Sequence, residues 1–469
     1  MEIKDKIPVH IGLFGHIDSG KTRIAAVLSE IISTAGIDAH PQSKERGITI
    51  DLGFTSFLLN KYLVTLVDGP GHADLIKISA SSVEIIDCAI VVIDINKGPQ
   101  VQTGEHLIII DSLKIKNVIV ILNKIDLFQG DIEKEIENTR EFFGSTSFGT
   151  NIPIFAVSAK DEVGFEELRQ GILKTIESLE IKRDFGDDII IPIDHHFTIK
   201  GMGAIITGTI LKGNLNLNQN LEVLPVKTSG RVKNIQIFHQ NVDSARAGDR
   251  VGINIKNLDV KKIYRGCIAT NNPKAFDYSD ILEIKVDKNK LFKPETQFGT
   301  QIHVTIGMFT TTGKIYPYSE LKQNKIQTNA GKKDFEFKAI LWLNEKVLIN
   351  KGKSIMLLSR LDLPPTTLRI LGSAKLIEIH KEPPLLYKVK VKKGRIQKDL
   401  ICIGLAQSAI GAKKIVGRQL EPPFTKILDT FGTKGAVIVG VKSKDIMVNK
   451  GDPVVLKELR SFLLKKTPV

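Results

Sequence analysis

The sequence has few of the residues that crosslink chains or bind soft metal ions. Its 469 residues include three cysteines, Cys88, Cys267 and Cys402, and no C-x-x-C pair. An odd number of widely spaced cysteines supports neither a disulfide framework nor a cysteine-based zinc site. We therefore expect all three thiols to be reduced and mostly buried.

Long apolar runs are absent as well. No segment reaches the roughly 18 consecutive apolar residues that a membrane-spanning helix needs. The N-terminal stretch MEIKDKIPVHIGLF has neither the apolar core nor the small-residue cleavage site of a secretory signal. We expect a cytoplasmic protein that has no membrane partner.

Length and charge give the next constraints. At roughly 100–200 residues per domain the chain predicts three or four domains. Its net charge is +14, and the segment from Leu376 to Val469 holds 19 lysines and arginines against 8 aspartates and glutamates. A basic C-terminal part favours an RNA partner through phosphate neutralisation. A solvated, lysine-rich surface explains the charge equally well.

Residues 1–185 alternate between strand and helix patterns. Apolar runs at 9–14, 62–68, 88–95, 118–124 and 154–160 predict strands. Helical spacing of apolar residues predicts helices between them, including 21–36 and 164–180. This alternation is typical of an α/β domain whose parallel sheet is covered on both faces.

The remaining residues are rich in short β-branched runs separated by Gly and Asn turns. We predict a β-barrel over 186–275, a second over 276–376, and a basic, β-rich, small barrel-like domain over 377–469. The polar stretch 319–334 inside the second block is interpreted as a loop or flexible insertion. The predicted fold is thus multidomain, with an N-terminal α/β P-loop domain followed by β domains.

A phosphate-binding motif follows the first predicted strand. Gly15, Gly20, Lys21 and Thr22 match G-x-x-x-x-G-K-[ST]. The glycines let main-chain N–H groups face the phosphates, and the following helix adds its positive N-terminal end. Lys21 would reach the β- and γ-phosphates, and the Thr22 hydroxyl would bind Mg²⁺. Asp18 and Ser19 complete the predicted loop.

Two further motifs predict recognition of guanine. Asn123, Lys124 and Asp126 end one apolar strand, and Ser158-Ala159-Lys160 ends the next. The Asp126 carboxylate could accept hydrogen bonds from guanine N1–H and its exocyclic amine, whereas adenine would leave it unpaired. A site that depends on such buried polar pairing can favour guanine over adenine nucleotides by a factor of ~10⁴.

A third group predicts GTP hydrolysis to GDP and phosphate. Asp68 begins the sequence Asp-Gly-Pro-Gly-His, and we expect its carboxylate to approach Mg²⁺ through water. The Gly71 N–H would sense the γ-phosphate, His72 would orient the attacking water, and the Thr49 hydroxyl would join the Mg²⁺ shell while γ-phosphate is present. Ile17 is a candidate for an apolar gate that keeps His72 away from the attacking water until hydrolysis is triggered.

These motifs, with GHID before the P-loop lysine, resemble the translational GTPases around elongation factor Tu. A larger part of the chain resembles the selenocysteine-specific elongation factors (SelB) of the archaeal and eukaryotic type. The resemblance lies in 192–210, 247–255, 263–268 and 360–370, and in GLAQS (404–408) and TFGTKG (430–435) of the last domain. It implies GTP-dependent delivery of selenocysteinyl-tRNA to a ribosome at a recoded UGA codon. Ser19 departs from the His that is common in these factors.

The resemblance also places Asp194, His195 and Arg250 in the aminoacyl pocket. A selenol is more acidic than a thiol, so a pocket for it should offer cations and hydrogen-bond donors. Arg250 is always charged, and His195 could be kept protonated by Asp194. Without the resemblance, DHHF would be interpreted as the start of a barrel strand with solvated Asp and His side chains, and AGDRVG as a β-turn with an exposed arginine.

The last domain is expected to contact RNA, either the long variable arm of the tRNA or a recoding element, directly or through an adaptor protein. Its densest basic cluster is Lys388, Lys390, Lys392, Lys393 and Arg395. Alternation with apolar residues would make one strand face basic. An edge strand that lysines protect from aggregation accounts for the same pattern. We expect a monomer.

Two alternative functions remain at this stage. One is a general or initiator aminoacyl-tRNA carrier of the same superfamily. The other is a GTPase subunit that regulates a metabolic enzyme, similar to that of sulfate adenylyltransferase. A binding module with an inactive nucleotide site is disfavoured, because the set Lys21, Thr22, Thr49, Asp68 and His72 is complete.

Replacing His72 tests the hydrolytic assignment. His72→Ala should lower ribosome-triggered GTP turnover, because the attacking water loses the group that orients it, while nucleotide binding persists. Turnover is measured as phosphate release, and binding by fluorescence titration. Unchanged turnover would count against the role of His72.

Overall fold

The computed structural model describes residues 5–29, 31–32, 53–68, 86–112, 114–199, 203–321, 323–351, 355–364, 366–443 and 446–465. The chain divides into two compact units, residues 1–315 with 330–381, and residues 316–329 with 382–468. None of the helices in these ranges is long and apolar enough to cross a membrane. The three cysteines are unpaired and buried, as expected.

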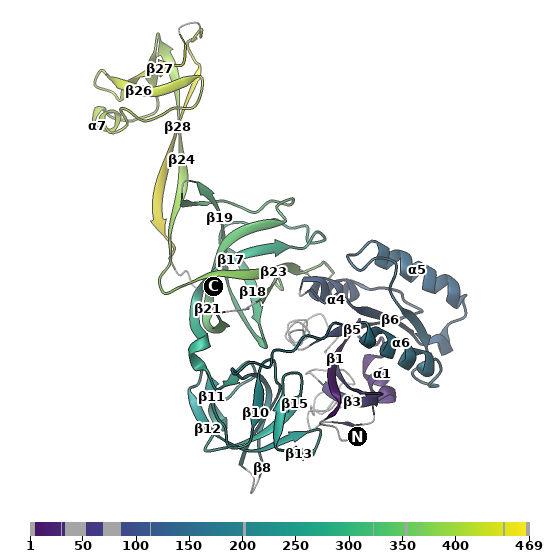
Figure 1. Ribbon diagram of the computed structural model, residues 1–469. Helices are drawn as coiled ribbons and strands as arrows, with labels where there is room; N and C mark the ends of the chain where they lie inside the picture. The colour runs from purple at the N-terminus through teal and green to yellow at the C-terminus, as the bar shows by residue number, and fades with distance from the viewer. Residues whose placement is uncertain are drawn as a thin grey trace. The chain divides into compact units, whose positions relative to one another are not determined.

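The N-terminal domain is built on a seven-stranded sheet of order β2-β3-β4-β1-β5-β6-β7. Its parallel core consists of β1 (Ile7–Phe14), β4 (Tyr62–Asp68), β5 (Cys88–Asp94), β6 (Val118–Asn123) and β7 (Ile154–Val157). Figure 1 shows helices α1 (Lys21–Leu28), α4 (Val101–Ser112), α5 (Ile132–Gly144) and α6 (Phe165–Glu177) around this sheet. The strands are almost wholly buried, which explains their uninterrupted apolar runs.

The sheet is mixed, whereas the sequence analysis predicted a parallel one. Strand β3 (Gly53–Leu59) runs antiparallel to β4, because the two-residue turn Asn60-Lys61 joins them as a hairpin. Asn60 adopts a positive φ of 52°, as such turns require. Alternation alone did not reveal this hairpin, since β3 lies outside the βαβ pattern.

The first helix is shorter than predicted. Helix α1 ends at Leu28, and Ile31–Ile32 form strand β2 instead of the last helical turn. The Ser29 hydroxyl and main-chain N–H both bond to Ala25 O, which closes the helix. Ile31 and Ile32 pair with Thr55 and Ser56 on β3, so strand pairing overrides the helical spacing. By contrast, α6 confirms the helix predicted for 164–180.

The first barrel confirms the prediction for the segment after residue 186. Strands β8 (Ile190–Ile199), β9 (Gly203–Thr209), β15 (Arg250–Lys256), β12 (Thr228–Ile237), β11 (Asn220–Leu224) and β16 (Ile268–Thr270) pair in a closed ring. The short strands β10 (Asn214–Asn216) and β14 (Ser244–Arg246) form a separate pair, and β13 (Gln240–Val242) extends β12 as a hairpin. Isoleucine, valine and leucine fill the interior.

A second closed ring follows, with β18 (Thr300–Ile306) pairing both β22 and β19. Its other strands are β19 (Phe309–Leu321), β21 (Glu336–Asn350), β17 (Phe276–Lys288), β23 (Ile370–His380) and β22 (Ile355–Ser359). Strand β23 continues past residue 376, and the compact units separate after Lys381. The expected boundary at 376 is therefore too early, because it cuts a continuous strand.

The C-terminal unit is β-rich, as predicted. The long strands β24 (Leu385–Lys398) and β28 (Pro453–Leu463) pair along their lengths (Figure 1). Strands β25 (Ile401–Ile403), β26 (Phe424–Phe431) and β27 (Ala436–Val441) and helix α7 (Ala409–Lys413) complete a small apolar core. Strand β20 (Asn324–Gln327) forms a hairpin with β19 and pairs with β24. The interpretation of 319–334 as a loop was thus wrong for its first half, where main-chain pairing stabilises polar residues as strands.

Two glycines of the first barrel offer a matched test of its packing. A Cβ on Gly208 would lie 2.2 Å from Pro192 O, whereas a Cβ on Gly252 meets nothing within 4 Å. Gly208→Ala should lower the free energy of unfolding by about 1–3 kcal/mol, because main-chain atoms must shift. Gly252→Ala on the adjacent strand should change it much less. Chemical denaturation measures both, and equal losses would contradict the contact.

Candidate functional site

The P-loop lies between β1 and α1. Gly15 and Gly20 have positive φ of 141° and 95°, and Asp18 has φ of 61°. A Cβ on Gly20 would lie 2.2 Å from Asn123 Nδ2, and one on Gly15 would lie 2.2 Å from Val92 O. Both glycines are therefore required by backbone conformation and by close packing.

Lys21 is buried at the start of α1. Its ammonium group donates to Gly15 O at 3.0 Å and to His16 O at 2.9 Å, which folds the side chain over the loop. Burial lowers the pKa of Lys21, and the carboxylates of Asp68 and Asp18 oppose that shift. The cation therefore lies inside the loop that the motif predicts to hold phosphates.

Thr22 and Asp68 meet beside the loop. The Thr22 hydroxyl donates to Asp68 Oδ2 at 2.8 Å, and Asp68 is buried at the end of β4. A hydroxyl and a carboxylate are the hard oxygen ligands that Mg²⁺ prefers, so this pair fits the predicted ion. Thr49, Gly71 and His72 lie outside the described residues.

Asn123 joins the phosphate loop to the predicted base site. Its side-chain NH₂ donates to Ser19 O at 2.9 Å, and its carbonyl oxygen accepts from the Ala159 N–H at 3.1 Å. Asn123 is 2% exposed. One buried amide therefore fixes the distance between the two loops.

The predicted guanine-binding residues converge at the ends of β6 and β7. Ser158 Oγ donates to Asp126 Oδ1 at 2.9 Å, so the two motifs are in direct contact. Ala159 is buried, whereas Lys160 is exposed. Lys124 has a positive φ of 71°, and its ammonium group pairs with Asp94 Oδ2 at 2.8 Å.

Sequence reasoning missed Asp94 and Asp161. Burial alone would raise the pKa of Asp94, but hydrogen bonds from Lys124 and Asn96 outweigh it and lower that pKa. Asp161 accepts from Ser158 Oγ at 3.3 Å and extends the base-side network. Asp94 ends β5, next to β6, so the rule that places binding residues at the carboxyl ends of parallel strands could have found it.

Ser19 is more enclosed than expected. The sequence predicts that the contacts of Ser19 come mainly from its main chain, and its carbonyl oxygen does accept a hydrogen bond from the Asn123 side chain. The side chain is nevertheless 1% exposed and lies against Gly15. The larger His that is common in similar factors therefore needs space that Ser19 does not occupy.

The predicted aminoacyl residues form a buried network on the first barrel. Arg250 binds Asp194 in a bidentate manner, with Nη1–Oδ2 of 2.5 Å and Nη2–Oδ1 of 3.2 Å. Thr207 Oγ1 donates to Asp194 Oδ1 at 2.6 Å, and His195 Nδ1 lies 3.0 Å from the same oxygen. Burial would raise the pKa of Asp194, but Arg250 and His195 together hold it well below its usual range.

Phe54 of the N-terminal domain covers this network. Its ring centroid lies 3.4 Å from Arg250 Cζ and 6.4 Å from the His195 ring. Phe54 lies on β3, which pairs with the strand that ends at Asp68. The cation–π contact connects the barrel pocket to the nucleotide-binding domain, and no spacing in the sequence predicted it.

A small cavity of about 50 Å³ lies beside Arg250, lined also by Thr207, Gln236, Phe238 and His239. Phe238 and His239 form the β12–β13 turn, with φ of 42° and 67°. Such turns favour Asn-Gly, so two bulky residues at positive φ indicate strain next to the cavity. The cavity holds only a few water-sized groups.

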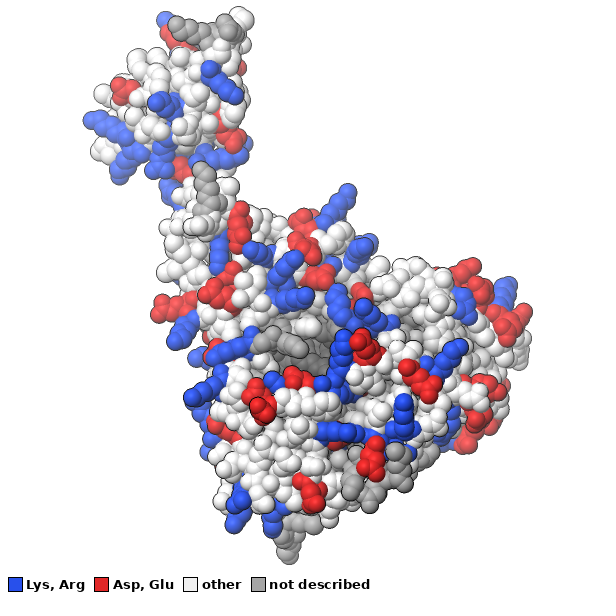
Figure 2. Space-filling model, viewed as in Figure 1, with Lys and Arg blue, Asp and Glu red and all other residues white. Residues whose placement is uncertain are grey.

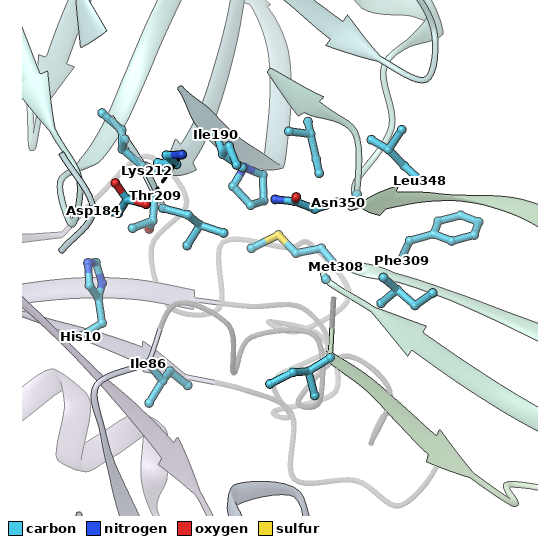
Figure 3. A pocket seen from close by; sticks show the side chains of 18 of the residues that line it. His10, Ile86, Asp184, Ile190, Thr209, Lys212, Met308, Phe309, Leu348 and Asn350 are labelled. Carbon is cyan, nitrogen blue, oxygen red and sulfur yellow. Dashed lines mark ion pairs between the residues drawn. The ribbon is translucent and has the colours of Figure 1, made fainter. Parts of the chain in front are cut away.

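A much larger cavity, of about 1100 Å³, lies elsewhere in the first unit (Figure 3). His10, Ile86, Lys212, Met308 and Asn350 surround it, and none of the predicted nucleotide-binding residues that the structure describes lines it. His10 Nε2 bonds to Gly248 O at 2.7 Å, and burial lowers the His10 pKa to about 4. The larger of the two cavities is therefore not the predicted nucleotide site.

One further group could hold a metal ion. Among the described residues, Glu283, Glu378 and His380 bring two carboxylates and an imidazole together on β17 and β23. His380 Nε2 lies 2.8 Å from Glu283 Oε2. These residues belong to the second barrel and not to the P-loop.

Comparison with known proteins decides the family. Residues 6–178 match the elongation factor Tu GTP binding domain, 203–270 match elongation factor Tu domain 2, and 277–380 match domain III of the archaeal selenocysteine-specific elongation factor. The selenocysteine-specific elongation factor of Methanocaldococcus jannaschii is 40% identical over 98% of this chain and 99% of its own length. The chain belongs to the selenocysteine-specific elongation factor family.

Two further similarities agree with this assignment. The crystal structure of elongation factor SelB from Methanococcus maripaludis in complex with the GTP analogue GppNHp superimposes with a TM-score of 0.81, at 36% identity, over 97% of this chain and 99% of that chain. The mouse selenocysteine-specific elongation factor is 37% identical over 67% of this chain and 57% of its own length. This SelB-family chain is a translational GTPase that binds GTP and GDP. The alternative functions are not favoured.

Removing the Asn123 amide tests the junction of the two loops. Asn123→Ala should weaken GDP and GTP binding about 30-fold, because two hydrogen bonds worth about 1 kcal/mol each are lost. The exposed Asn138, which bonds Glu135 on α5, offers the control Asn138→Ala. Fluorescence titration measures affinity, and thermal unfolding checks the fold. Equal affinities for both variants would refute the role of Asn123.

Proposed function

We propose that this protein delivers selenocysteinyl-tRNA to the ribosome at recoded UGA codons and releases it when GTP is hydrolysed. The observation that carries the proposal is the buried Arg250–Asp194 pair beside the small cavity of the first barrel. A neighbouring domain covers this pair through Phe54. The residues proposed for the aminoacyl site therefore contact the domain that carries the P-loop.

The small cavity beside Arg250 suits a short anionic side chain. Arg250 places a guanidinium at its wall, paired with the Asp194 carboxylate, and Thr207, Gln236 and His239 add polar groups. A selenolate would accept hydrogen bonds from such donors more strongly than the neutral serine hydroxyl. Large side chains exceed the space of about 50 Å³. Selection would thus rest on both size and charge.

On the nucleotide side, Lys21 and the loop Asp18 to Thr22 would hold the phosphates. Thr22, Thr49 and Asp68 would hold Mg²⁺, which supplies charge neutralisation at the β- and γ-phosphates when bound. Asn123, Lys124 and Asp126, with Ser158, Ala159 and Lys160, would form the guanine site. Gly71 would sense the γ-phosphate, and His72 would orient the attacking water.

We propose four domains, at residues 1–185, 186–275, 276–381 and 382–469. The last would contact RNA, either the tRNA or a recoding element of the mRNA, or an adaptor protein. Strand register supports a basic face on the β24–β28 ribbon, formed by Lys388, Lys390 and Lys392 with Arg460 opposite Lys388. Lys393 and Arg395 fall at alternating positions on the other face, so the predicted cluster divides in two.

Surface charge agrees with a nucleic-acid partner for this unit. Figure 2 shows Lys and Arg side chains at several places on it. Glu458 neutralises part of the basic face, since it pairs with Lys392 at 3.2 Å. Lys388 and Lys390 are exposed, so their replacement by alanine should reduce the salt dependence of tRNA binding.

We propose that the protein acts as a monomer in the cytoplasm, where ribosomes translate.

Filter binding with the GTP-loaded protein tests the function. Selenocysteinyl-tRNA should bind more tightly than seryl-tRNA and a standard aminoacyl-tRNA. Arg250→Ala should reduce the ratio of selenocysteinyl-tRNA affinity to seryl-tRNA affinity by about tenfold, because the cavity wall loses its guanidinium donors. Arg231→Ala, an exposed arginine of the same barrel, is the matched control. An unchanged ratio for Arg250→Ala would remove Arg250 from the pocket, and equal affinity for all three tRNAs would reject the function.

A further inference from the structure

Helix α4 supplies acceptors for main-chain N–H groups of the P-loop. The Ile17 N–H donates to Gln102 Oε1 at 3.3 Å, and the Gly15 N–H donates to His106 Nδ1 at 3.2 Å. Gln102 and His106 are four residues apart, so they lie on the same helix face. The first half of the loop, Gly15 to Ile17, is therefore held from α4, whereas Asp18 to Thr22 are the residues predicted to hold the phosphates.

His106 is held in the state that this contact requires. It is 2% exposed, and its ring packs on Phe14 with centroids 5.6 Å apart. Burial, together with the charges of Lys21 and His16, lowers the His106 pKa to about 3. The imidazole is thus neutral at physiological pH, with Nδ1 accepting and the proton on Nε2.

The residue before His106 connects α4 to the second barrel. The Glu105 carboxylate accepts from Arg369 Nε at 2.9 Å, from Arg369 Nη2 at 3.0 Å and from the Arg369 main-chain N–H at 3.1 Å. Glu105 and Arg369 are 0% and 2% exposed. Arg369 directly precedes β23, which lies beside α4 (Figure 1). Gly104 allows close approach here, since a Cβ on it would lie 3.3 Å from Leu368 Cδ2.

A buried ion pair with three bonds resists displacement, because breaking it leaves an uncompensated charge. A shift of the second barrel must therefore move α4 or break this pair. Moving α4 displaces the groups that hold Gly15 and Ile17. We propose that α4 couples the position of the second barrel to nucleotide release, with Gln102 and His106 as positioning residues of the P-loop. By linkage, bound nucleotide would stabilise the position of that barrel in return.

The rate of GDP release tests this coupling. In the full-length protein, Arg369→Gln should accelerate release of a fluorescent N-methylanthraniloyl GDP about tenfold, as expected for a contact that loses a buried charge-assisted bond. Lys114 and Asp287 form an exposed pair between the same two domains, 3.2 Å apart with side chains 59% and 55% exposed. Lys114→Ala is the matched control, and it should leave the rate within about twofold, because exposed pairs contribute little.

Variants of His106 test the path itself. His106→Leu removes the acceptor and should accelerate release, whereas His106→Asn places an oxygen near the position of Nδ1 and should restore much of the slow rate. If Arg369 acts through α4, the double variant Arg369→Gln/His106→Leu should accelerate GDP release by less than the product of the accelerations that the two single variants cause. Equality with that product would overturn the coupling, because independent sites multiply.

Thermal unfolding is measured for every variant whose release rate is measured, to check that the variant is folded. If Arg369→Gln does not fold, Arg369→Lys keeps the charge, loses the bidentate geometry and serves in the same assays. A folded Arg369 variant with an unchanged release rate would overturn the proposal, and so would equal acceleration by Lys114→Ala. The assay needs no tRNA, so its failure is distinguishable from failure of the proposed tRNA delivery.

Discussion

The nucleotide-binding domain depends on one amide side chain, that of Asn123. It bonds the phosphate loop through Ser19 O and the base-side turn through the Ala159 N–H. The two loops come from opposite ends of the domain's sequence, and neither contains a regular element that could set their distance. Because Asn123 is buried and uses both its donor and its acceptor, the distance follows from hydrogen-bond geometry. Gly20 is required for the same reason, since any side chain there would occupy the position of the amide.

The motif residues could be predicted because their chemistry is local. A glycine loop after a strand, an NKID turn and an SAK turn are each encoded within a few residues, and parallel pairing brings their strand ends together. The alternation of strand and helix patterns likewise predicted the N-terminal fold, and β-branched runs predicted the barrels.

Other features depend on partners that are distant in sequence. The end of α1 is set by Ser29 and by pairing of Ile31 and Ile32 with β3, so helical spacing misassigned those residues. The polar stretch after Tyr318 forms a strand because its main chain pairs, which composition does not show. Phe54 stacks on Arg250, and Glu105 binds Arg369, through contacts between domains that no motif spacing encodes. Arg250 itself was located by family resemblance and not by its neighbours in sequence.

Two buried contacts between domains share one chemical pattern. Arg369 binds Glu105, and Arg250 stacks on Phe54, each with a guanidinium at the boundary. A planar, multidentate group fixes orientation as well as distance, which a lysine cannot do.

The β19–β20 hairpin has a consequence for how this architecture could have been assembled. Since β20 pairs with β24, the C-terminal unit is made from two separate stretches of chain, and the backbone passes between the units at 315, 329 and 381. The two units are therefore connected by three chain crossings and not by a single linker. A protein shortened at residue 381 would keep β20 as an unprotected edge, open to intermolecular pairing. Loss or gain of the last unit in evolution would thus have required a coordinated change inside the second barrel.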